Sequence, residues 1–295
     1  MAINVSTLPE YVDENKLGLI AKTVYGAPSV KYLNIQTGIK HKAAINLLST
    51  DPTLQAASCG WDENGDVDIT QRELVVGNYK VNMSFCDKTL QEKWLNQEVI
   101  ARAGAEVLPF EEKFTNDIVK AVGRKVENLI WNADSSVSSD PFDGLLTIAV
   151  ADATPVTSAA TTMYGKVKDV YLAIPVDVID RAQIFMGVDS FRTLCQDLVT
   201  ANLYHYQADM NSDRLELVLP GSNTKVVGVS GLNGTGAILA ADPENLYYGV
   251  DMQDDEEAFE FWYSKDNREF RLAIGFNAGT QIAFPDQVVV YVPEP

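Results

Sequence analysis

Histidine and cysteine are scarce in this chain of 295 residues. The two histidines, His41 and His205, have no HExxH, GxSxG, Cys-His or P-loop pattern around them, so we expect no histidine-based catalysis. The cysteines Cys59, Cys86 and Cys195 are odd in number and far apart, and no CxxC pair is present. This spacing indicates neither a disulfide framework nor a zinc knuckle. We therefore expect ordinary thiols in a reducing, cytosolic compartment.

Positively charged residues are also few. Lysine and arginine number 23 against 41 aspartates and glutamates, which gives a formal net charge of −18. A surface this acidic repels phosphates, so nucleic-acid or anionic-membrane binding is not expected as the main activity. The acidic start of the chain lacks the basic region of a signal peptide, and no apolar run approaches the roughly 18 residues of a membrane span.

What the sequence does contain is typical of a folded protein. Hydrophobic residues make up 46% of the chain and aromatic residues 9%, enough for a sizeable core. The length allows about two domains or one elaborated domain. The first 50 residues mix short apolar patches with polar spacers, which predicts an extended arm with at most short helices or strands.

A pair of β-prone runs follows the arm. Ile69 to Val76 and Tyr79 to Phe85 are rich in β-branched and aromatic residues, and Gly77-Asn78 between them is a hairpin-turn signal. A two-stranded ribbon is marginally stable alone in water. We therefore expect it to lie against another part of the assembly, such as a second subunit.

The clearest helical pattern begins after Pro109, downstream of a shorter amphipathic stretch at 91–108. Apolar residues recur there mostly four positions apart, which predicts one long amphipathic helix of about 24 residues and roughly 36 Å. Its predicted core face consists of Phe110, Phe114, Ile118, Val122, Val126, Leu129 and Ile130.

The second half of the chain predicts a mixed α/β or α+β lobe followed by closing strands. A loop or linker is expected over 149–162, a strand over 167–174, a helix opening at Pro175 and another helix over 190–206. Further strands are expected over 215–219, 225–229, 237–240 and 246–250. The closing strands are expected over 259–263, 269–274, 280–284 and 288–292, with Asn277-Ala278-Gly279 as a break.

Motifs that could carry chemistry are weak. The acidic stretch from Asp62 to Asp68, with Glu73, has the ligand spacing of a calcium loop, but Val67 occupies the place that needs glycine. The glycine-rich run over 231–236 lies between two predicted strands and precedes no helix, so a loop is the better interpretation. The carboxylates between Asp251 and Glu260 are typical of a solvated face. We predict no metal and no cofactor.

The order of these elements resembles the Hong Kong 97 type of tailed-bacteriophage major capsid protein, which encapsulin shells share. Ile69 to Leu74 with Tyr79 to Cys86 resembles the family's E-loop hairpin, and Leu108 to Asn132 its spine helix. Phe142-Asp143-Gly144-Leu145-Leu146 is similar to the turn that many members carry after that helix. Asp242 to Asp251, with the stretches around 281–285 and 288–291, resembles the strands that return from the axial to the peripheral domain.

The resemblance implies an α+β capsid fold and a division of the chain into five parts. These are an N-terminal arm (1–55), an E-loop ribbon (56–92), a peripheral domain with the spine helix (93–165), an axial domain (166–250) and the return strands of the peripheral domain (251–295). The implied inter-subunit residues of the E-loop are Trp61, Arg72, Leu74, Val76, Tyr79, Lys80 and Val81. One family member links its subunits through a Lys-Asn isopeptide bond, but nothing beside Lys80 or Lys88 identifies an Asn partner, so we carry no such chemistry over.

The resemblance also implies a function without catalysis. Hexamers and pentamers of the chain would form an icosahedral virion head that encloses double-stranded DNA without reading its sequence. The head would be assembled in the bacterial cytoplasm. A portal and decoration proteins are further implied partners. Only about 50 residues precede the ribbon, so we expect no internal scaffold, and assembly by a separate scaffolding protein or by the shell protein itself. Two alternatives stay open: an encapsulin-like compartment for a cargo enzyme, and a hydrolase that uses the carboxylates of 251–260.

Overall fold

The computed structural model describes residues 25–54, 65–86, 110–137, 140–203, 215–251, 259–267 and 269–293, with isolated positions at 59 and between 12 and 23. The helices are α3 (Phe110–Asn132), α4 (Leu145–Asp152), α5 (Met163–Ala173) and α6 (Val188–Thr200), with short 3-10 turns η2 (Pro28–Tyr32), η4 (Ser230–Leu232), η5 (Pro243–Asn245) and η6 (Pro285–Gln287). The strands are β1 (Asn34–Thr37), β2 (Lys42–Pro52), β3 (Gly65–Val75), β4 (Gly77–Cys86), β5 (Thr154–Val156), β6 (Gln183–Gly187), β7 (Glu216–Val218), β8 (Lys225–Val229), β9 (Ile238–Ala241), β10 (Leu246–Asp251), β11 (Phe259–Ser264), β12 (Glu269–Ile282) and β13 (Val289–Tyr291).

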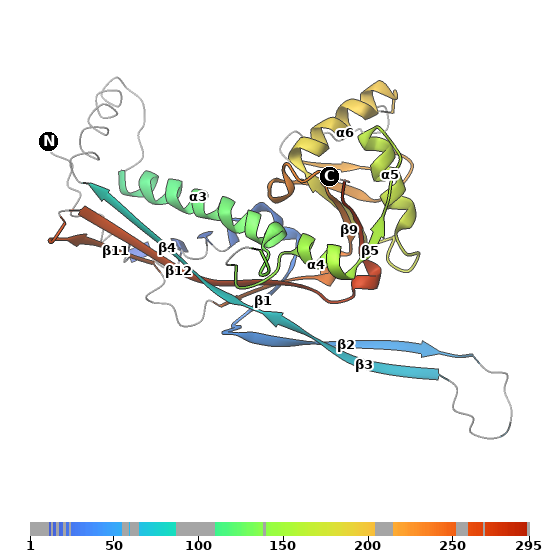
Figure 1. The fold of residues 1–295 in the computed structure, drawn as a ribbon, viewed down its shortest axis with the longest axis horizontal. Coiled ribbons are helices and arrows are strands. Elements are labelled where there is room, and N and C mark those ends of the chain that lie inside the picture. The colour runs from blue at the N-terminus through green and yellow to red at the C-terminus, as the bar shows by residue number, and fades with distance from the viewer. Residues whose placement is uncertain are drawn as a thin grey trace.

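Helix α3 confirms the predicted spine. It runs for 23 residues along one face of a sheet, as Figure 1 shows. Ile118, Val122 and Val126 are buried in the main hydrophobic core, where β4, β11 and β12 meet the helix. Phe114 makes edge contacts with Phe85 of β4 and Phe261 of β11, at ring-centroid distances of 5.1 and 6.3 Å. The four-residue spacing of the apolar stripe therefore has its expected cause, burial against the chain's own sheet.

That sheet has five strands centred on the long β12. β10 and β11 pair antiparallel with different stretches of one edge of β12, and β4 pairs antiparallel with the other edge. β1 extends the sheet by pairing parallel with β10. Alternate β12 residues from Phe270 to Ala278 are buried, so one face of the strand lies beneath α3. The predicted break at 277–279 is wrong, since β12 continues through it.

A six-stranded sheet forms the axial lobe, in the order β5-β13-β9-β6-β8-β7. Helices α5 and α6 cover one face, where Val170 and Leu194 pack on Ile184 and Met186. The opposite face, through Phe185, joins the core of α3. Burial on both faces explains why β6 and β9 are almost uniformly apolar.

Several sequence predictions for this lobe and the segments around it are wrong. The stretch predicted as a strand over 167–174 lies in α5, and the helix expected from Pro175 is a series of turns before β6. The expected linker over 149–162 contains the end of α4 and strand β5. β10 belongs to the five-stranded sheet beneath α3 and β13 to the six-stranded sheet, so strand pairing does not follow the expected division at residue 250. The helix predicted at 91–108 lies outside the described residues.

Candidate assembly surfaces

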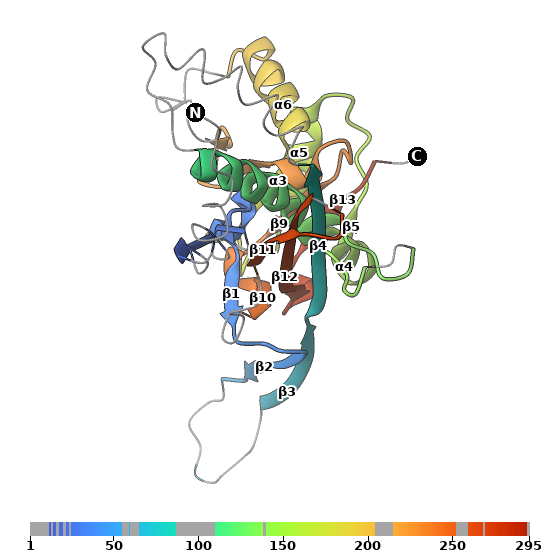
Figure 2. The same ribbon diagram turned by 90° about the vertical axis from the view of Figure 1, so that its left-hand side faces the viewer.

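A two-stranded ribbon, β2 paired with β3, projects beyond the body of the protein in both views (Figures 1 and 2). The strands pair antiparallel from Lys42 opposite Val75 to Pro52 opposite Gly65. No further strand of the described chain pairs with either of them. Such a ribbon leaves two rows of backbone N–H and C=O groups free to pair with another chain.

This ribbon differs from the predicted hairpin. Gly77-Asn78 is not a turn: β3 and β4 run in succession, and β4 pairs with β12 instead of folding back on β3. The tight hairpin turn favoured by such a pair needs positive φ at both central residues, and Gly77 and Asn78 both lack it. Gly77 is instead packed so closely that a Cβ on it would lie 2.1 Å from Cγ of Pro141. The true partner of β3 is β2, inside the segment predicted as an arm.

The outer half of the ribbon exposes apolar side chains. Leu48 and Ile69 lie opposite each other in the strand register and keep 61% and 73% of their surface exposed. Polar pairs flank them toward the body: Gln71 donates to Asn46 at 2.8 Å, and Lys42 lies 2.7 Å from Glu73. The hydrogen bond and charge of Lys42 lower the pKa of Glu73. This exposed apolar pair on a projecting ribbon is a candidate contact surface for another molecule.

The base of the ribbon is anchored to its own chain. Leu74 and Val76 are buried in a cluster with Ile45 and Leu47 of β2, Ile39 and Ala283. The side-chain amide of Gln281 donates to the backbone carbonyl of Glu73 at 2.7 Å, and Arg72 forms an ion pair with Asp152 at the end of α4. The ribbon is therefore held firmly at one end.

A buried carboxylate joins the arm, the spine helix and the axial lobe. Glu127 of α3 is 1% exposed and accepts hydrogen bonds from the backbone N–H of Ser29 at 3.0 Å and from its hydroxyl at 2.6 Å. Trp131 Nε1 donates to the same hydroxyl at 2.8 Å. Burial raises the pKa of Glu127 despite these donors and a hydrogen bond donated by the backbone of Gly231 in η4. This network fixes the arm on the C-terminal half of the helix.

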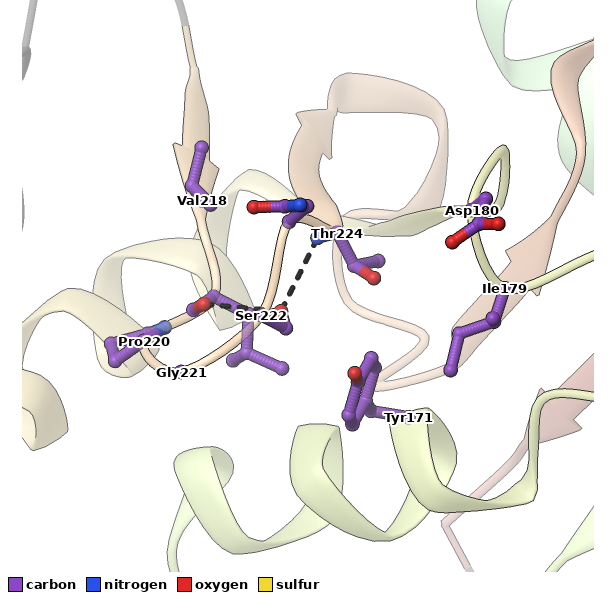
Figure 3. Close-up of a pocket in the computed structure, with 10 residues that line it drawn as sticks. Tyr171, Ile179, Asp180, Val218, Pro220, Gly221, Ser222 and Thr224 are labelled. Atoms are coloured by element: carbon purple, nitrogen blue, oxygen red, sulfur yellow. Dashed lines mark hydrogen bonds between the residues drawn. The ribbon is translucent and has the colours of Figure 1, made fainter. Parts of the chain in front are cut away.

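An open cleft of about 520 Å³ lies at the edge of the axial lobe (Figure 3). Tyr171 of α5 faces the loop after β7, and Ile179 and Asp180 line another side. Ser222 Oγ accepts from the backbone N–H of Thr224 at 3.2 Å, which closes the loop on itself. Asp180 is the one ionisable carboxylate among the ten lining residues, so the cleft lacks the paired acid and base of a hydrolytic site.

Comparison with solved structures finds proteins whose fold is similar to that of this chain. A procapsid of satellite phage P4 that includes the size determination protein Sid aligns over 94% of this chain and 90% of the other, with a TM-score of 0.61 and 14% identity. A structure from Microbacterium phage Oxtober96 aligns over 91% of both chains, with a TM-score of 0.60 and 14% identity. A virus-like particle from Pyrococcus furiosus aligns over 94% and 97%, with a TM-score of 0.52 and 8% identity.

The chain has the Hong Kong 97 type capsid fold. No protein-family model and no curated protein matches the sequence. Within this fold, α3 is the spine helix and β2–β3 is the E-loop ribbon. The predicted fold class, α+β with arm, ribbon, spine and axial lobe, is thus confirmed from structure, although the ribbon is built from different strands than the sequence suggested.

The predicted E-loop residues separate into two groups. Leu74 and Val76 are buried at the ribbon base, and Tyr79 and Val81 of β4 pack against the main core. Leu74 and Val76 therefore have almost no surface to offer a neighbour, whereas Tyr79 and Val81 are only partly buried. Arg72 is paired with Asp152, and Lys80 is exposed on β4. Trp61 lies outside the described residues.

The predicted spine residues largely take their expected places in the capsid fold. Phe114 and Leu129 are partly buried against the main core, and Ile118, Val122 and Val126 lie within it. The helix begins at Phe110, whose side chain is outside the described set. The residue that sequence reasoning missed is Glu127, because a lone carboxylate on a helix gives no signal of burial.

The weak metal and catalytic motifs of the sequence form no recognisable site among the described residues. Those residues contain no group of three or more histidine, cysteine, aspartate or glutamate side chains placed to hold a metal ion. His41 is exposed, whereas His205 and most of the carboxylate run of 251–260 lie outside the described set. Cys59 and Cys86 are exposed free thiols, and burial raises the pKa of Cys195. Within the described part of the chain, every helix is too short or too polar to cross a membrane.

Proposed function

We propose that this chain is the major shell protein of a tailed bacteriophage, which assembles through hexamers and pentamers into an icosahedral head around double-stranded DNA. The observation that carries the proposal is the β2–β3 ribbon, an element that its own chain covers only at the base. The capsid fold of structures such as the satellite phage P4 procapsid supports it.

The ribbon explains how subunits would hold one another. Its outer half, with Leu48 and Ile69, would lie over the neighbouring subunit, while Leu74 and Val76 keep its base in place. Burying the two exposed side chains would contribute about 1.5–3 kcal/mol each if they become fully covered. Many copies of this contact in one shell would give a very large total interface without a single dominant site.

The axial lobe would supply the second contact, around the centre of each hexamer or pentamer. Val218 lines the cleft of Tyr171, and Leu172 and Val176 follow Tyr171 in the chain. These three apolar side chains are exposed: Leu172 by 68%, Val176 by 84% and Val218 by 47%. The outer edge of β7, beside Val218, pairs with no other strand of the described chain. Exposed apolar side chains beside a free strand edge fit a contact between copies of this lobe.

The charge of the chain fits a container for DNA. With a net charge of −18, most of the wall would repel packaged DNA, so the DNA is enclosed without being read. We place the protein in the virion after assembly in the host cytoplasm, and we propose a separate scaffolding protein, a portal and decoration proteins as partners. The role is structural and non-enzymatic.

A second candidate is an encapsulin-like compartment that encloses a cargo protein. The likeness to the virus-like particle from Pyrococcus furiosus, with a TM-score of 0.52, supports it less than the likeness to the satellite phage P4 procapsid, with a TM-score of 0.61, supports the phage capsid. The two candidates share a fold and differ in what the particle holds.

Negative-stain microscopy of the purified full-length chain, with nuclease and protein analysis of the particle contents, tests both. We expect closed shells of uniform size, and nuclease-protected DNA in those isolated from infected cells. Small particles filled with a second protein would favour the compartment. A protein that stays monomeric at high concentration, with and without its scaffold, would refute both.

A further inference from the structure

Basic side chains are concentrated on one face of α3, in a protein that is otherwise strongly acidic. Between Lys113 and Asn128 the outward face of the helix carries four cations, and Asp117 is the one exposed carboxylate of that stretch. Lys120, Arg124 and Lys125 are all exposed and make no ion pair with the described part of the chain.

The arm adds a further cation to this face. Lys22 and Lys120 line the same cleft between the arm and α3, together with Tyr25, Asn116 and Val119. We call Lys22, Lys120, Arg124 and Lys125 the spine basic face. Asp117, three residues before Lys120, is the one exposed carboxylate within this stretch of the helix, so the four cations of the spine basic face keep an excess of positive charge.

We propose that the spine basic face contacts phosphates of the enclosed DNA, so that the outward face of α3 points into the shell. The inference rests on the proposed function and goes beyond it, because it states which surface of the chain faces the interior of the shell and which residues contact the DNA. Phosphate oxygens are the acceptors that unpaired lysine and arginine side chains bind most readily in nucleic acids.

The geometry favours a regular polyanion over a folded acidic partner. Lys120 and Arg124 are one helical turn apart, a rise of about 6 Å, close to the roughly 7 Å that two nucleotide steps span along a DNA strand. Arg124 and Lys125 are exposed on the helix surface, and Lys22 and Lys120 are exposed where they line the cleft beside it, so all four cations are accessible to the outside of a duplex. Because charge is screened within about 8–10 Å, the local basic face attracts phosphates although the whole chain repels them.

Such an arrangement would hold DNA at one point per subunit and repel it elsewhere. Contacts of this kind carry no sequence information and weaken steeply with salt. The wall would therefore order the outermost layer of DNA without binding it tightly, which agrees with enclosure that is independent of sequence.

The test uses the full-length chain before assembly, at a physiological ionic strength of about 0.15 M, with a short fluorescent DNA duplex as the probe and anisotropy as the readout. The variant carries Lys120→Glu, Arg124→Glu and Lys125→Glu. A charge-matched control carries Lys168→Glu, Arg192→Glu and Lys225→Glu, three exposed cations of the axial lobe. A neutral set, with glutamine at 120, 124 and 125, guards against misfolding through charge reversal, and circular dichroism checks each protein.

We expect the spine variant to lose at least tenfold in affinity for the duplex and the control less than threefold. The slope of log affinity against log salt should fall by about 0.9 for each phosphate that the variant no longer neutralises. Equal reductions in affinity for the two triple variants would overturn the inference, as would a wild-type chain that binds no duplex. Binding of poly-glutamate without binding of the duplex would also overturn it and assign the face to an acidic protein segment.

Shell formation by each variant is scored separately by microscopy. Failure of the proposed function would appear as absent shells in the wild type, whereas failure of this inference would appear as normal shells with unchanged DNA affinity in the spine variant.

Discussion

The burial of the spine helix can be tested with a graded series at Ile118. This side chain is 7% exposed and lies in the main core. Replacing it by valine should reduce the free energy of unfolding by about 0.5–1.5 kcal/mol, and by alanine about 2–5 kcal/mol, through reduced burial and the cavity left behind. Ile118→Asp removes the same apolar contacts and adds a buried carboxyl group.

The aspartate variant should be the most severe because the described residues of that core are all apolar and offer its carboxyl group no cation. Keeping the group neutral at pH 7, from an ordinary pKa of about 3.9, costs roughly 4 kcal/mol. Added to the reduced burial, the total is of order 6 kcal/mol or more, which is comparable to the whole stability of a typical domain of about 5–15 kcal/mol. We expect no soluble, cooperatively melting protein.

Ala121→Asp is the matched control, since Ala121 lies exposed on the same helix and the charge change is identical. It should cost only about 0.5 kcal/mol in helix propensity. Thermal and urea unfolding, followed by circular dichroism, compare the two proteins. If Ile118→Asp melted at the same temperature as Ala121→Asp, the assignment of the buried face of α3 would be wrong.

Three further predictions concern the ribbon base and the buried junction. Leu74→Ala should lower the unfolding free energy by about 2–5 kcal/mol, whereas Arg72→Ala, which removes a partly exposed ion pair, should cost no more than about 1 kcal/mol in the same urea titration. Gly279→Ala should also destabilise the chain, by about 1–3 kcal/mol, because its Cβ would lie 2.1 Å from the carbonyl oxygen of Val75, and a normal melting temperature would contradict this close approach. Burial raises the pKa of Glu127 above its ordinary 4.5, so the folded state binds the carboxyl proton of Glu127 more tightly than the unfolded state does. The stability that this proton contributes is complete below pH 4.5 and declines as the pH rises through the pKa of Glu127 in the folded protein. The stability of Glu127→Gln, measured over the same pH range, should lack this decline, and parallel pH profiles of the two proteins would refute it.

How far the sequence predicts this fold depends on which physical constraint each residue satisfies. The spine was predictable because its apolar residues repeat every four positions and face one sheet. The α5 segment was misjudged because Val167, Val170 and Ile174 are β-branched, and their composition concealed a helical spacing of three and four. Thr162, whose hydroxyl accepts from the backbone N–H of Gly165, caps that helix.

The two misplaced breaks have a common cause. Gly77 and Gly279 suggested turns, yet both are glycines because another part of the chain approaches them closely: Pro141 in one case and the backbone of Val75 in the other. A sequence does not distinguish a glycine needed for positive φ from one needed for close packing. The burial of Glu127 was equally hidden, since its partner Ser29 is 98 residues away in the chain.

The central claim is that the β2–β3 ribbon joins subunits into a shell, and a ribbon-shortened variant tests it most directly. Leu47 and Thr70 are paired across the ribbon, so a short Gly-Ser turn can replace residues 48–69 while the buried base is kept. Sedimentation velocity then compares this variant with the full chain under assembly conditions. We predict particles far heavier than the 32.4 kDa protomer for the full chain, and a folded protomer with an unchanged melting temperature for the variant. Regular shells formed by the shortened protein would contradict the account.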